Sequence, residues 1–319
     1  MTIAKIASHI AKKAKEIKVI HGIALRYFVE VAQTGSLAAA SENLHVAVSA
    51  ISRQISKLEQ ETGTPLFERL PRGMVLTEAG QLLAEHARRT LLDAQTVLGE
   101  ISSRHAGSCS LVRLACTDGF AHVLLPDVMM AYHQAHPQTR FVLHCGSPSQ
   151  VQHWVETGEA DIGLGFTMAH TQAIEVVLHG TLPVCALLRP GHPLATQEVL
   201  TLADLACYPL AILERGNTVR QLLEWSFTAQ GQVFTPLLSS GHASALHRFA
   251  AHTDTIALGS HLAIHGLPEC KQLLAKRIDE PLLQQRQLQL MTMKARRLPA
   301  AVSKFLRLLE QKLHAAMAI

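Results

Sequence analysis

The sequence predicts an α/β protein with a helical N-terminal part and a larger C-terminal part of alternating strands and helices. Residues 23–105 carry apolar side chains mainly at helical spacing, with one interruption by two short apolar stretches around a proline–glycine turn. From residue 108 onward, short apolar strands alternate with helical segments, which is typical of mainly parallel sheets with helices on both faces. A chain of 319 residues also suits two domains.

The N-terminal extension, residues 1–22, holds the excess of positive charge. Its five Lys and one Glu give +4, which equals the net charge of the whole chain. Four isoleucines share one face at helical spacing, namely Ile3, Ile6, Ile10 and Ile17. An amphipathic helix of this kind contacts DNA phosphates, a membrane surface or a partner. The alternatives are a solvated extra helix and a start codon assigned too far upstream.

Three helices are predicted next, at 23–31, 37–44 and 48–61. Gly35 ends the first helix, and Ser36 is a good N-cap for the second. The third helix follows a short turn, and its buried face is Ile51, Ile55 and Leu58 at spacing i, i+4, i+7.

The opposite face of the third helix carries hydroxyl and basic side chains, which are Ser49, Ser52, Arg53, Ser56 and Lys57. Small side chains permit close approach to a major groove, and Arg can bind guanine O6 and N7 with two hydrogen bonds. We therefore predict a helix–turn–helix whose third helix enters the major groove. Lys57 faces either phosphate or solvent.

A wing is predicted over residues 63–77, because two short apolar stretches flank the turn Pro71-Arg72-Gly73. Arg72 at its tip is available for the minor groove or for phosphate. Arg69 either contacts DNA or clamps the wing through a salt bridge. Glu59 is interpreted as a helix-pairing residue rather than a base reader.

A long helix follows, capped by Thr77 and continuing to about residue 105. Its apolar residues alternate steps of three and four, at Ala84, Ala87, Leu91, Ala94, Leu98 and Ile101. Such a seam pairs with a second helix, or it packs on the DNA-binding domain of the same subunit. Residues 102–110, which contain Gly107, are interpreted as a hinge.

The C-terminal part begins with predicted strands at 111–116, 140–144 and 161–165, with helices at about 120–136 and 146–157 between them. Ligands in such sheets bind at the carboxyl ends of strands, near helix N-termini.

The N-terminal residues form one ordered pattern: Leu25-x-x-Phe28, Gly35-Ser36-Leu37, Ala39-Ala40, Leu44, Ser52-Arg53-Gln54-Ile55, Leu58-Glu59, Gly63, Leu66-Phe67-x-Arg69, Arg72, Leu76-Thr77 and Ala79-Gly80. This pattern resembles the winged helix–turn–helix of LysR-type transcriptional regulators. The resemblance implies that Ser52, Arg53 and Arg72 touch DNA. The full set of candidate DNA contacts is Ser36, Val48, Ser49, Ser52, Arg53, Lys57, Arg69 and Arg72. Val48 departs from the family, which often has a polar residue there, and could contact a thymine methyl group instead.

A second pattern, Leu125-Pro126, His136-Pro137, Gly158-Glu159-Ala160-Asp161-Ile162 and His192-Pro193-Leu194, resembles the effector-binding domain of the same regulators. The resemblance implies two α/β subdomains, as in periplasmic binding proteins, with ligand in the cleft. The segment 251–256 departs from the glycine-containing segment that the family commonly has. The implied boundaries are 23–80 for the DNA-binding domain, 81–106 for the linker helix, 107–319 for the effector-binding domain, about 107–180 and 282–319 for subdomain I, and about 181–281 for subdomain II.

Candidate effector contacts are the polar residues beside predicted helix starts: Thr117, Ser147, Ser149, Thr167, Asn217 and Thr218. Hydroxyl groups there would bind a carboxylate or another small anion. The alternative is that they only cap helices.

The implied function is a ligand-responsive transcriptional regulator that binds a pseudo-palindromic promoter site in double-stranded DNA as a homodimer or homotetramer. A small-molecule effector is implied as a second partner, and RNA polymerase is a candidate third. No membrane partner is expected, and residues 1–20 lack the apolar core of a signal peptide, which predicts a cytoplasmic protein.

No enzyme motif, cofactor or metal site is expected. The sequence lacks a phosphate loop, a Gly-x-Ser-x-Gly elbow and a G-x-G-x-x-G motif. The pairs His261/His265 and His133/His136 lack a nearby third ligand, so exposed or capping histidines are the favoured interpretation. The six cysteines form no C-x-x-C pair and are interpreted as free thiols. The alternative function is a solute-binding protein, against which the DNA-binding module and the missing signal argue.

Overall fold

The computed structural model describes residues 22–71, 73–103, 109–166, 171–264 and 273–317. The chain divides into two compact units, residues 1–98 and 99–319. Among the helices that are described, none combines the length and the apolar character that a membrane span needs. The predicted basic extension lies outside the described residues, apart from Gly22.

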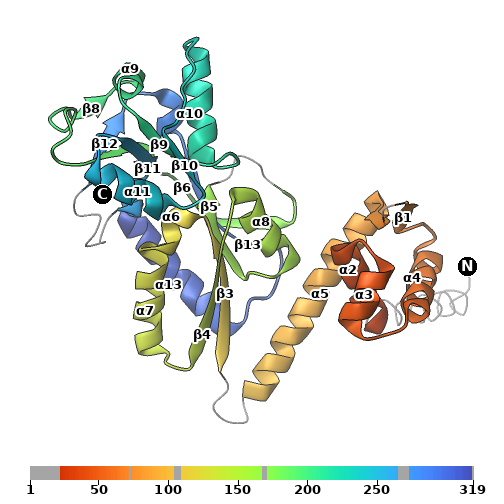
Figure 1. The fold of residues 1–319 in the computed structure, drawn as a ribbon. Helices are drawn as coiled ribbons and strands as arrows, with labels where there is room; N and C mark the ends of the chain where they lie inside the picture. Colours follow the sequence, from red (N-terminus) through yellow and green to blue (C-terminus); the bar gives the residue numbers. More distant parts are fainter. Residues whose placement is uncertain (1–21, 72, 104–108, 167–170, 265–272, 318–319) are drawn as a thin grey trace, which may run out of the picture. The chain divides into compact units, whose positions relative to one another are not determined.

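The first unit contains three helices followed by a β-hairpin and the start of a long helix (Figure 1). These elements are α2 (Ile23–Thr34), α3 (Leu37–Leu44), α4 (Val48–Thr62), β1 (Phe67–Leu70), β2 (Gly73–Leu76) and α5 (Glu78–Ser103). Two predicted caps are present. The Ser36 hydroxyl accepts a hydrogen bond from the Ala39 amide at 3.4 Å, and the Thr77 hydroxyl accepts one from the Gly80 amide at 3.0 Å.

The core of the first unit joins α2, α4 and the hairpin. The predicted stripes are buried, with Leu25, Ile51 and Leu58 each at most 1% exposed. The rings of Phe28 and Phe67 lie 5.1 Å apart and connect the helices to β1. This packing fixes which face of α4 remains open to solvent.

The hairpin is held against the turn between α2 and α3. The Met74 amide donates to the Gly35 carbonyl at 2.8 Å. Gly73 has φ +135°, and a Cβ there would collide with the Gly35 carbonyl oxygen. Glycine at residue 73 therefore permits β2 to approach the helices closely.

The apolar seam of α5 divides into two parts. Ala84 and Ala87 are buried in the core of the first unit, and Leu91 packs against that core. This half of the seam therefore packs on the DNA-binding domain of the same subunit, which is one of the two alternatives that the sequence left open. Leu98 and Ile101, further along, are 63% and 54% exposed.

The second unit contains two mixed sheets. The first sheet has the strand order β4-β3-β5-β13-β6. Its strands are β3 (Ser110–Cys116), β4 (Thr139–Cys145), β5 (Ile162–Phe166), β6 (Ile174–Thr181) and β13 (Gln287–Met293). The helices α7 (Leu124–Ala135) and α13 (Ala300–Met317) cover one face, and α8 (Pro148–Thr157) covers the other. The predicted strand pattern is confirmed, although β13 runs antiparallel to both neighbours.

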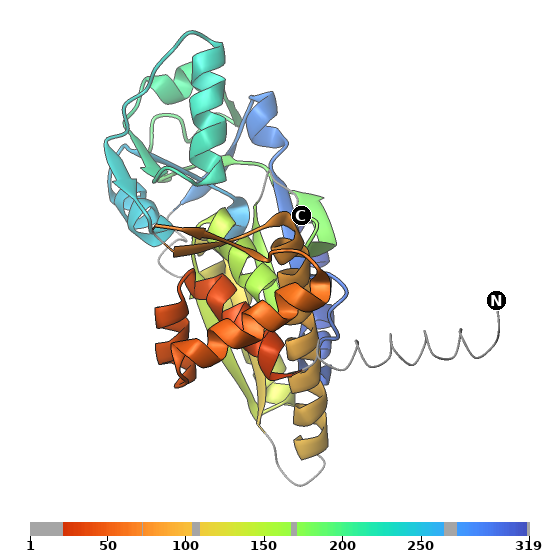
Figure 2. The ribbon, with the colours of Figure 1, turned by 90° about the vertical axis from the view of Figure 1, so that its right-hand side faces the viewer.

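The second sheet has the order β10-β9-β11-β7-β12-β8. Its strands are β7 (Cys185–Leu188), β8 (Val199–Leu200), β9 (Leu210–Leu213), β10 (Leu238–Ser240), β11 (Ile256–Gly259) and β12 (Leu274–Ile278). The helices around it are α9 (Leu202–Ala206), α10 (Thr218–Ala229), α11 (Ala243–His252), the 3₁₀ helix η2 (His261–Ala263) and α12 (Pro281–Gln284). Helix α10 packs on one face and α11 on the other (Figure 2).

The chain crosses twice between the two sheets, after β6 and before β13. The two crossing segments are hydrogen-bonded to each other: the Leu182 amide donates to the Arg286 carbonyl, and the Val184 amide to the Leu283 carbonyl, both at 2.9 Å. The Arg286 side chain is buried over the Phe166 ring at 3.6 Å, and its Nε donates to the Leu182 carbonyl at 3.2 Å. These contacts make a paired connection of the kind that supports hinge motion.

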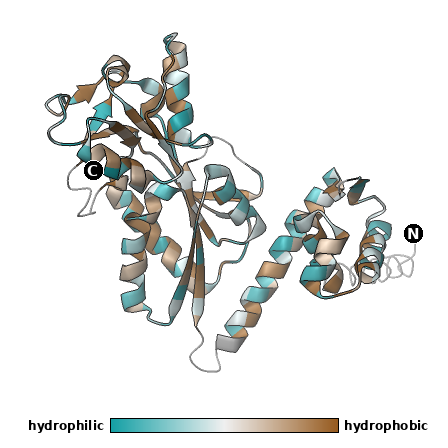
Figure 3. Cartoon of the chain, viewed as in Figure 1, coloured by the Kyte–Doolittle hydropathy of each residue, from teal (hydrophilic) through white to brown (hydrophobic). Residues whose placement is uncertain are grey.

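One predicted helix is shorter than expected. The sequence predicted a continuous helix at about 120–136, but α6 (Asp118–Ala121) ends first and α7 begins at Leu124. Pro126 explains the break, because it lacks an amide proton and is tolerated only in the first turn of a helix. The core is continuous across this break, because Phe120 before it and Leu125 after it belong to the same buried cluster. The strands of both sheets are mainly hydrophobic and are largely brown in Figure 3.

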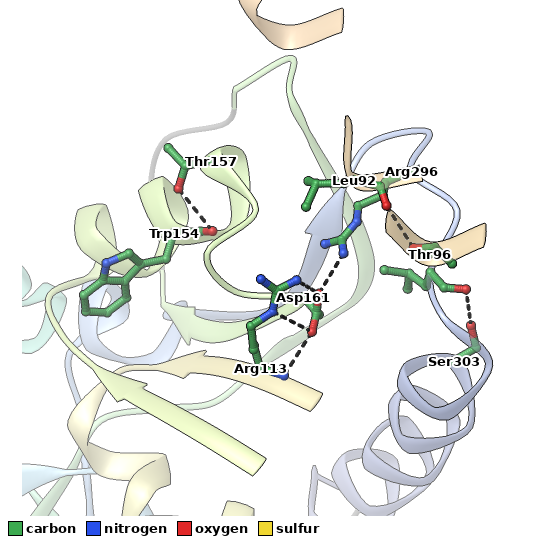
Figure 4. A network of polar contacts seen from close by, with 9 residues as sticks. Leu92, Thr96, Arg113, Trp154, Thr157, Asp161, Arg296 and Ser303 are labelled. Carbon is green, nitrogen blue, oxygen red and sulfur yellow. Dashed lines mark hydrogen bonds and ion pairs between the residues drawn. The ribbon is translucent and has the colours of Figure 1, made fainter. Parts of the chain in front are cut away.

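A buried charge network lies at the start of β5 (Figure 4). Asp161 is 2% exposed and accepts four hydrogen bonds. The Arg113 amide, Nε and Nη2 donate at 3.0, 3.3 and 2.9 Å, and Arg296 Nη2 donates at 2.8 Å. Asp161, the acidic residue of the Gly158–Ile162 motif, therefore connects the start of β5 to β3 and to the segment that follows β13.

Candidate functional site

The exposed face of α4 is the candidate nucleic-acid interface. Val48, Ser49, Arg53 and Lys57 are exposed, and Ser52 is half-buried. The buried face of the same helix is anchored in the core through Ile51, Ile55 and Leu58. Arg53 Nε lies 3.4 Å from the Ser49 carbonyl, a long hydrogen bond within the helix that a stronger acceptor can replace. The structure thus brings five of the predicted DNA contacts together on one surface.

The remaining predicted DNA contacts, Ser36, Arg69 and Arg72, do not belong to α4. Ser36 is half-buried and caps α3. Arg69 is exposed on β1 opposite Met74, and it forms no ion pair with any residue that the structure describes. Arg72 lies outside the described residues. The salt-bridge alternative for Arg69 is therefore not seen.

Glu59 has a structural contact that sequence reasoning did not identify. Its Oε1 accepts a hydrogen bond from the Leu66 amide at 3.0 Å. The residue was interpreted as one that pairs helices, but it binds the segment that leads from α4 into β1. The contact holds the residue just before β1 against α4 and so helps to position the hairpin relative to that helix.

A cavity of about 360 Å³ lies between the two sheets of the second unit. Its walls come from the carboxyl end of β4 and the start of α8, from the loop between β9 and α10, and from the loop before α11. The side chains that carry charge or strong hydrogen-bonding groups there are Asp118, Ser147, Gln150, Glu214, Arg215, Asn217 and His242. A site of this size at the ends of parallel strands is typical of small-molecule binding.

Two predicted effector contacts, Ser147 and Asn217, line this cavity from opposite sides. Both also cap helices. Ser147 forms a capping box with Gln150 at the start of α8, and Asn217 Oδ1 accepts from the Val219 amide at 2.9 Å. Capping and ligand contact are compatible here, because the N-termini of α8 and α10 both open onto the cavity.

Three other predicted contacts, Thr117, Ser149 and Thr218, do not line the cavity. Ser149 is exposed, with its Oγ 3.1 Å from the Ser147 Oγ. Thr117 and Thr218 are buried, and the Oγ1 of each has no hydrogen-bond partner. Thr167 lies outside the described residues. Among the predicted contacts that the structure describes, Ser147 and Asn217 line the cavity.

Asp118 is one of the residues in the cavity lining that the sequence did not indicate as a contact. It stands directly after Thr117, at the start of α6, and its Oδ2 accepts from the Ala243 amide at 2.7 Å. His122 Nε2 and His242 Nδ1 lie 3.4 and 3.7 Å from its carboxylate oxygens. Asp118 thus links the first sheet to the first turn of α11 across the cavity.

A buried histidine lies on α11 behind this contact. His247 is 4% exposed, and burial lowers its pKa to about 4. The nearby Asp118 carboxylate opposes this shift, and His122 adds to it. His247 therefore stays neutral at physiological pH. Across the described residues, no group of three or more His, Cys, Asp or Glu side chains is placed to hold a metal ion.

Both parts of the chain match models of known protein families. Residues 23–81 match the model of the bacterial regulatory helix-turn-helix protein, lysR family. Residues 105–314 match the LysR substrate binding domain, which covers more than half of the chain.

Individual relatives agree with this match. The chain is 28% identical to a RuBisCO operon transcriptional regulator of Allochromatium vinosum over 246 residues, which are 76% of this chain and 78% of the relative. It is 31% identical to the DNA-binding transcriptional dual regulator OxyR of Escherichia coli over 208 residues, which are 64% of this chain and 68% of the relative.

Solved structures share the fold. A full-length OxyR variant from Pseudomonas aeruginosa aligns with a TM-score of 0.61 at 18% identity, over 92% of this chain and 95% of that one. Full-length CbnR in complex with its target DNA aligns with a TM-score of 0.52 at 21% identity, over 91% and 98%. The chain therefore belongs to the LysR family of bacterial helix-turn-helix regulatory proteins, and it is a DNA-binding transcriptional regulator that responds to a small ligand.

Proposed function

We propose that this regulator reads promoter DNA with the exposed face of α4 and responds to a small polar effector in the cavity between its two sheets. The observation that carries the first part is the two-sided character of α4. Its apolar face is buried, while Ser49, Ser52 and Arg53 face outward at its first turns. Short side chains let the helix approach base edges, and Arg53 supplies bidentate donors.

The other contacts in this proposal position the helix. Lys57, Ser36 and Arg69 are assigned to phosphates, and Arg72 is assigned to the minor groove or to phosphate at the wing. Val48 is 43% exposed and is assigned to a thymine methyl group. This division makes Arg53 the residue with the largest expected effect on sequence preference.

The test uses a DNA site selected from a random duplex library with the wild-type protein. Arg53→Ala should weaken binding to that site by about 5- to 150-fold, the equivalent of the roughly 1–3 kcal/mol carried by one bidentate base contact. Arg189→Ala, which changes an arginine of the second unit, is the matched control and should leave affinity unchanged. Equal affinities for the two variants would show that Arg53 does not contribute to DNA binding.

The effector is proposed to carry both an anionic group and a hydrogen-bond donor group. The N-termini of α8 and α10 provide partial positive charge near Ser147 and Asn217. The carboxylates of Asp118 and Glu214 lie in the same lining and suit an ammonium or hydroxyl donor. Amino acids and hydroxy acids have this combination and fit a cavity of about 360 Å³.

A thermal-shift panel of amino acids, hydroxy acids, dicarboxylates and simple amines tests this assignment. A compound with both groups should raise the melting temperature, because binding to the folded state alone stabilises by about 2.7 kcal/mol at 100 times its Kd. Asp118→Asn should remove the shift, and Asp127→Asn, an exposed carboxylate on α7, should keep it. Shifts produced by amines or dicarboxylates alone would contradict the proposed chemistry.

In this proposal, effector binding affects the DNA-binding unit by shifting the populations of conformations that already exist without ligand. The hydrogen bond from the Ala243 amide to Asp118 joins the two sides of the cavity, so a ligand that competes for this carboxylate changes how the two sides are held together.

The second half of α5 is proposed to contribute to the homo-oligomer interface through exposed apolar side chains such as Val97. The cytoplasm is the proposed location, since it gives access to chromosomal DNA.

The competing assignment, a solute-binding protein without a regulatory role, leaves the helix-turn-helix unexplained. The relatives are transcriptional regulators, and we propose no catalytic reaction for the cavity.

A further inference from the structure

Two thiols lie side by side at the cavity, one in its wall and the other buried behind it. Cys116 is the last residue of β3 and Cys145 the last residue of β4, and the two are register partners in parallel strands. Their sulfur atoms are 3.8 Å apart. Cys116 is completely buried, whereas Cys145 is exposed and lines the cavity. Local sequence patterns do not indicate this pair, because helical segments and a strand separate the two residues along the chain.

The two thiols are chemically unequal. The hydrogen bond between the two sulfur atoms lowers the pKa of Cys145, although burial and the Asp118 carboxylate oppose this. The same hydrogen bond, together with burial, raises the pKa of Cys116. Since the thiolate is the reactive form of cysteine, the sulfur that faces the cavity is the nucleophile and the buried one keeps its proton.

We propose that Cys145 and Cys116 form a thiol–disulfide modification site in which Cys145 reacts with a hydroperoxide that enters the cavity and Cys116 converts the product into an intramolecular disulfide. The proposal depends on the cavity and on the two sulfur atoms. It does not depend on which effector the cavity binds.

The chemistry balances with the hydroperoxide as the oxidant. The Cys145 thiolate attacks one peroxide oxygen, the O–O bond breaks, and the departing oxygen takes up a proton and leaves as an alcohol, or as water when the oxidant is hydrogen peroxide. Cys145 is thereby oxidised by two electrons to a sulfenic acid. The Cys116 sulfur then attacks the Cys145 sulfur, the S–S bond forms, and the sulfenic hydroxyl leaves with the thiol proton as water.

The backbone geometry permits the bond. Adjacent strands lie about 4.7–4.9 Å apart, and disulfides bridge Cα atoms about 4.4–6.8 Å apart. The sulfur atoms have to close from 3.8 Å to about 2.05 Å, which small side-chain rotations can provide without moving either strand. The disulfide would withdraw the Cys145 thiol from the cavity wall and join β3 covalently to β4.

Other cysteines provide internal controls. Cys109 and Cys207 are exposed, and their thiols donate to the backbone carbonyls of Ser110 and Ala203. They are accessible to the same reagent, but in the described part of the chain neither has a sulfur partner such as Cys145 has. Selective oxidation therefore separates the proposed site from general thiol reactivity.

The experiment treats the reduced full-length protein with one equivalent of cumene hydroperoxide, blocks the remaining thiols with iodoacetamide and maps the peptides by mass spectrometry. We expect a linked Cys116–Cys145 peptide pair, the loss of two alkylatable thiols per chain, and recovery of both with dithiothreitol. Cys109 and Cys207 should remain alkylated.

Variants separate the two steps. Cys116→Ser, or Cys116→Ala if the hydroxyl destabilises the core, should stop at a sulfenic acid on Cys145 that dimedone traps. Cys145→Ser should leave Cys116 reduced, and Cys207→Ser should behave as wild type. Oxidation of Cys109 and Cys207 as fast as Cys145, with no linked peptide, would overturn the proposal, as would the absence of a dimedone adduct on Cys145 in both Cys116 variants.

Discussion

Removal of the Asp161 carboxylate should destabilise the second unit more than any loss of a surface charge. Asp161 and the Arg296 side chain are each 2% exposed, and Asp161 is the acceptor for Arg296 Nη2. Arg296 Nε and Nη1 have no hydrogen-bond partner among the described residues, so Asp161→Ala leaves a buried cation with no acceptor there for any of these three nitrogens. Breaking a buried pair in this way costs about 3–5 kcal/mol.

Urea unfolding measures this cost selectively, because the only two tryptophans of the chain, Trp154 and Trp225, both belong to the second unit. At a slope of about 2–3 kcal/mol per molar urea, the midpoint of Asp161→Ala should fall by roughly 1–2.5 M. Asp254→Ala is the matched control. Its partner Arg189 is 35% exposed and Asp254 is 53% exposed, so the loss should stay below about 1 kcal/mol. Equal midpoints for the two variants would refute the structural role given to the network.

Two further predictions concern a buried histidine and a buried glycine. The pKa of His247 is lowered to about 4 in the folded state, so the protein should lose stability as pH falls below about 6.5, by about 2 kcal/mol at pH 5. His247→Leu should flatten the difference in unfolding free energy between pH 7 and pH 5, and an unchanged difference in chemical denaturation would contradict the assignment. Gly80→Ala places a Cβ against the Leu66 carbonyl and should destabilise the first unit by about 1–3 kcal/mol in circular dichroism melts. Gly99→Ala, a helical glycine with open space around it, is the control, and an equal effect of the two would exclude the close contact.

The helical elements follow directly from local sequence. The spacing of Ile51, Ile55 and Leu58 predicted the buried face of α4, and the structure buries all three. The hydroxyl caps at Ser36 and Thr77 were also predictable, since a cap involves residues only three apart. These features depend on neighbours along the chain, which is why sequence patterns contain them.

The contacts that were missed depend on neighbours in space. Spacing alone did not decide whether the apolar seam of α5 meets its own domain or a second helix, and Ala84 and Ala87 pack in their own domain. The role of Asp118 depends on α11, which is more than 120 residues away in the chain. The pair of Cys116 and Cys145 depends on strand register, which the spacing between them does not specify.

A cavity lies at the edge of the sheet where the sequence predicted the effector site, but the predicted residues are only part of its lining. The rule that ligands bind at the carboxyl ends of parallel strands placed Ser147 and Asn217 correctly beside the cavity. Hydroxyl residues were favoured over charged ones, so Glu214 and Arg215 were not considered. Charged side chains in loops are common on any surface, and only the fold shows which of them face a cavity.

The most direct test of the central claim is the ratio of affinities for the selected site and for an unrelated duplex of equal length. If Arg53 reads bases, Arg53→Ala should reduce specific binding by about 5- to 150-fold and change non-specific binding far less, and Arg53→Lys should keep the charge without restoring the ratio. If Arg53 contacts only phosphate, both duplexes should lose affinity together and Arg53→Lys should restore both. That second result would contradict the role assigned to α4.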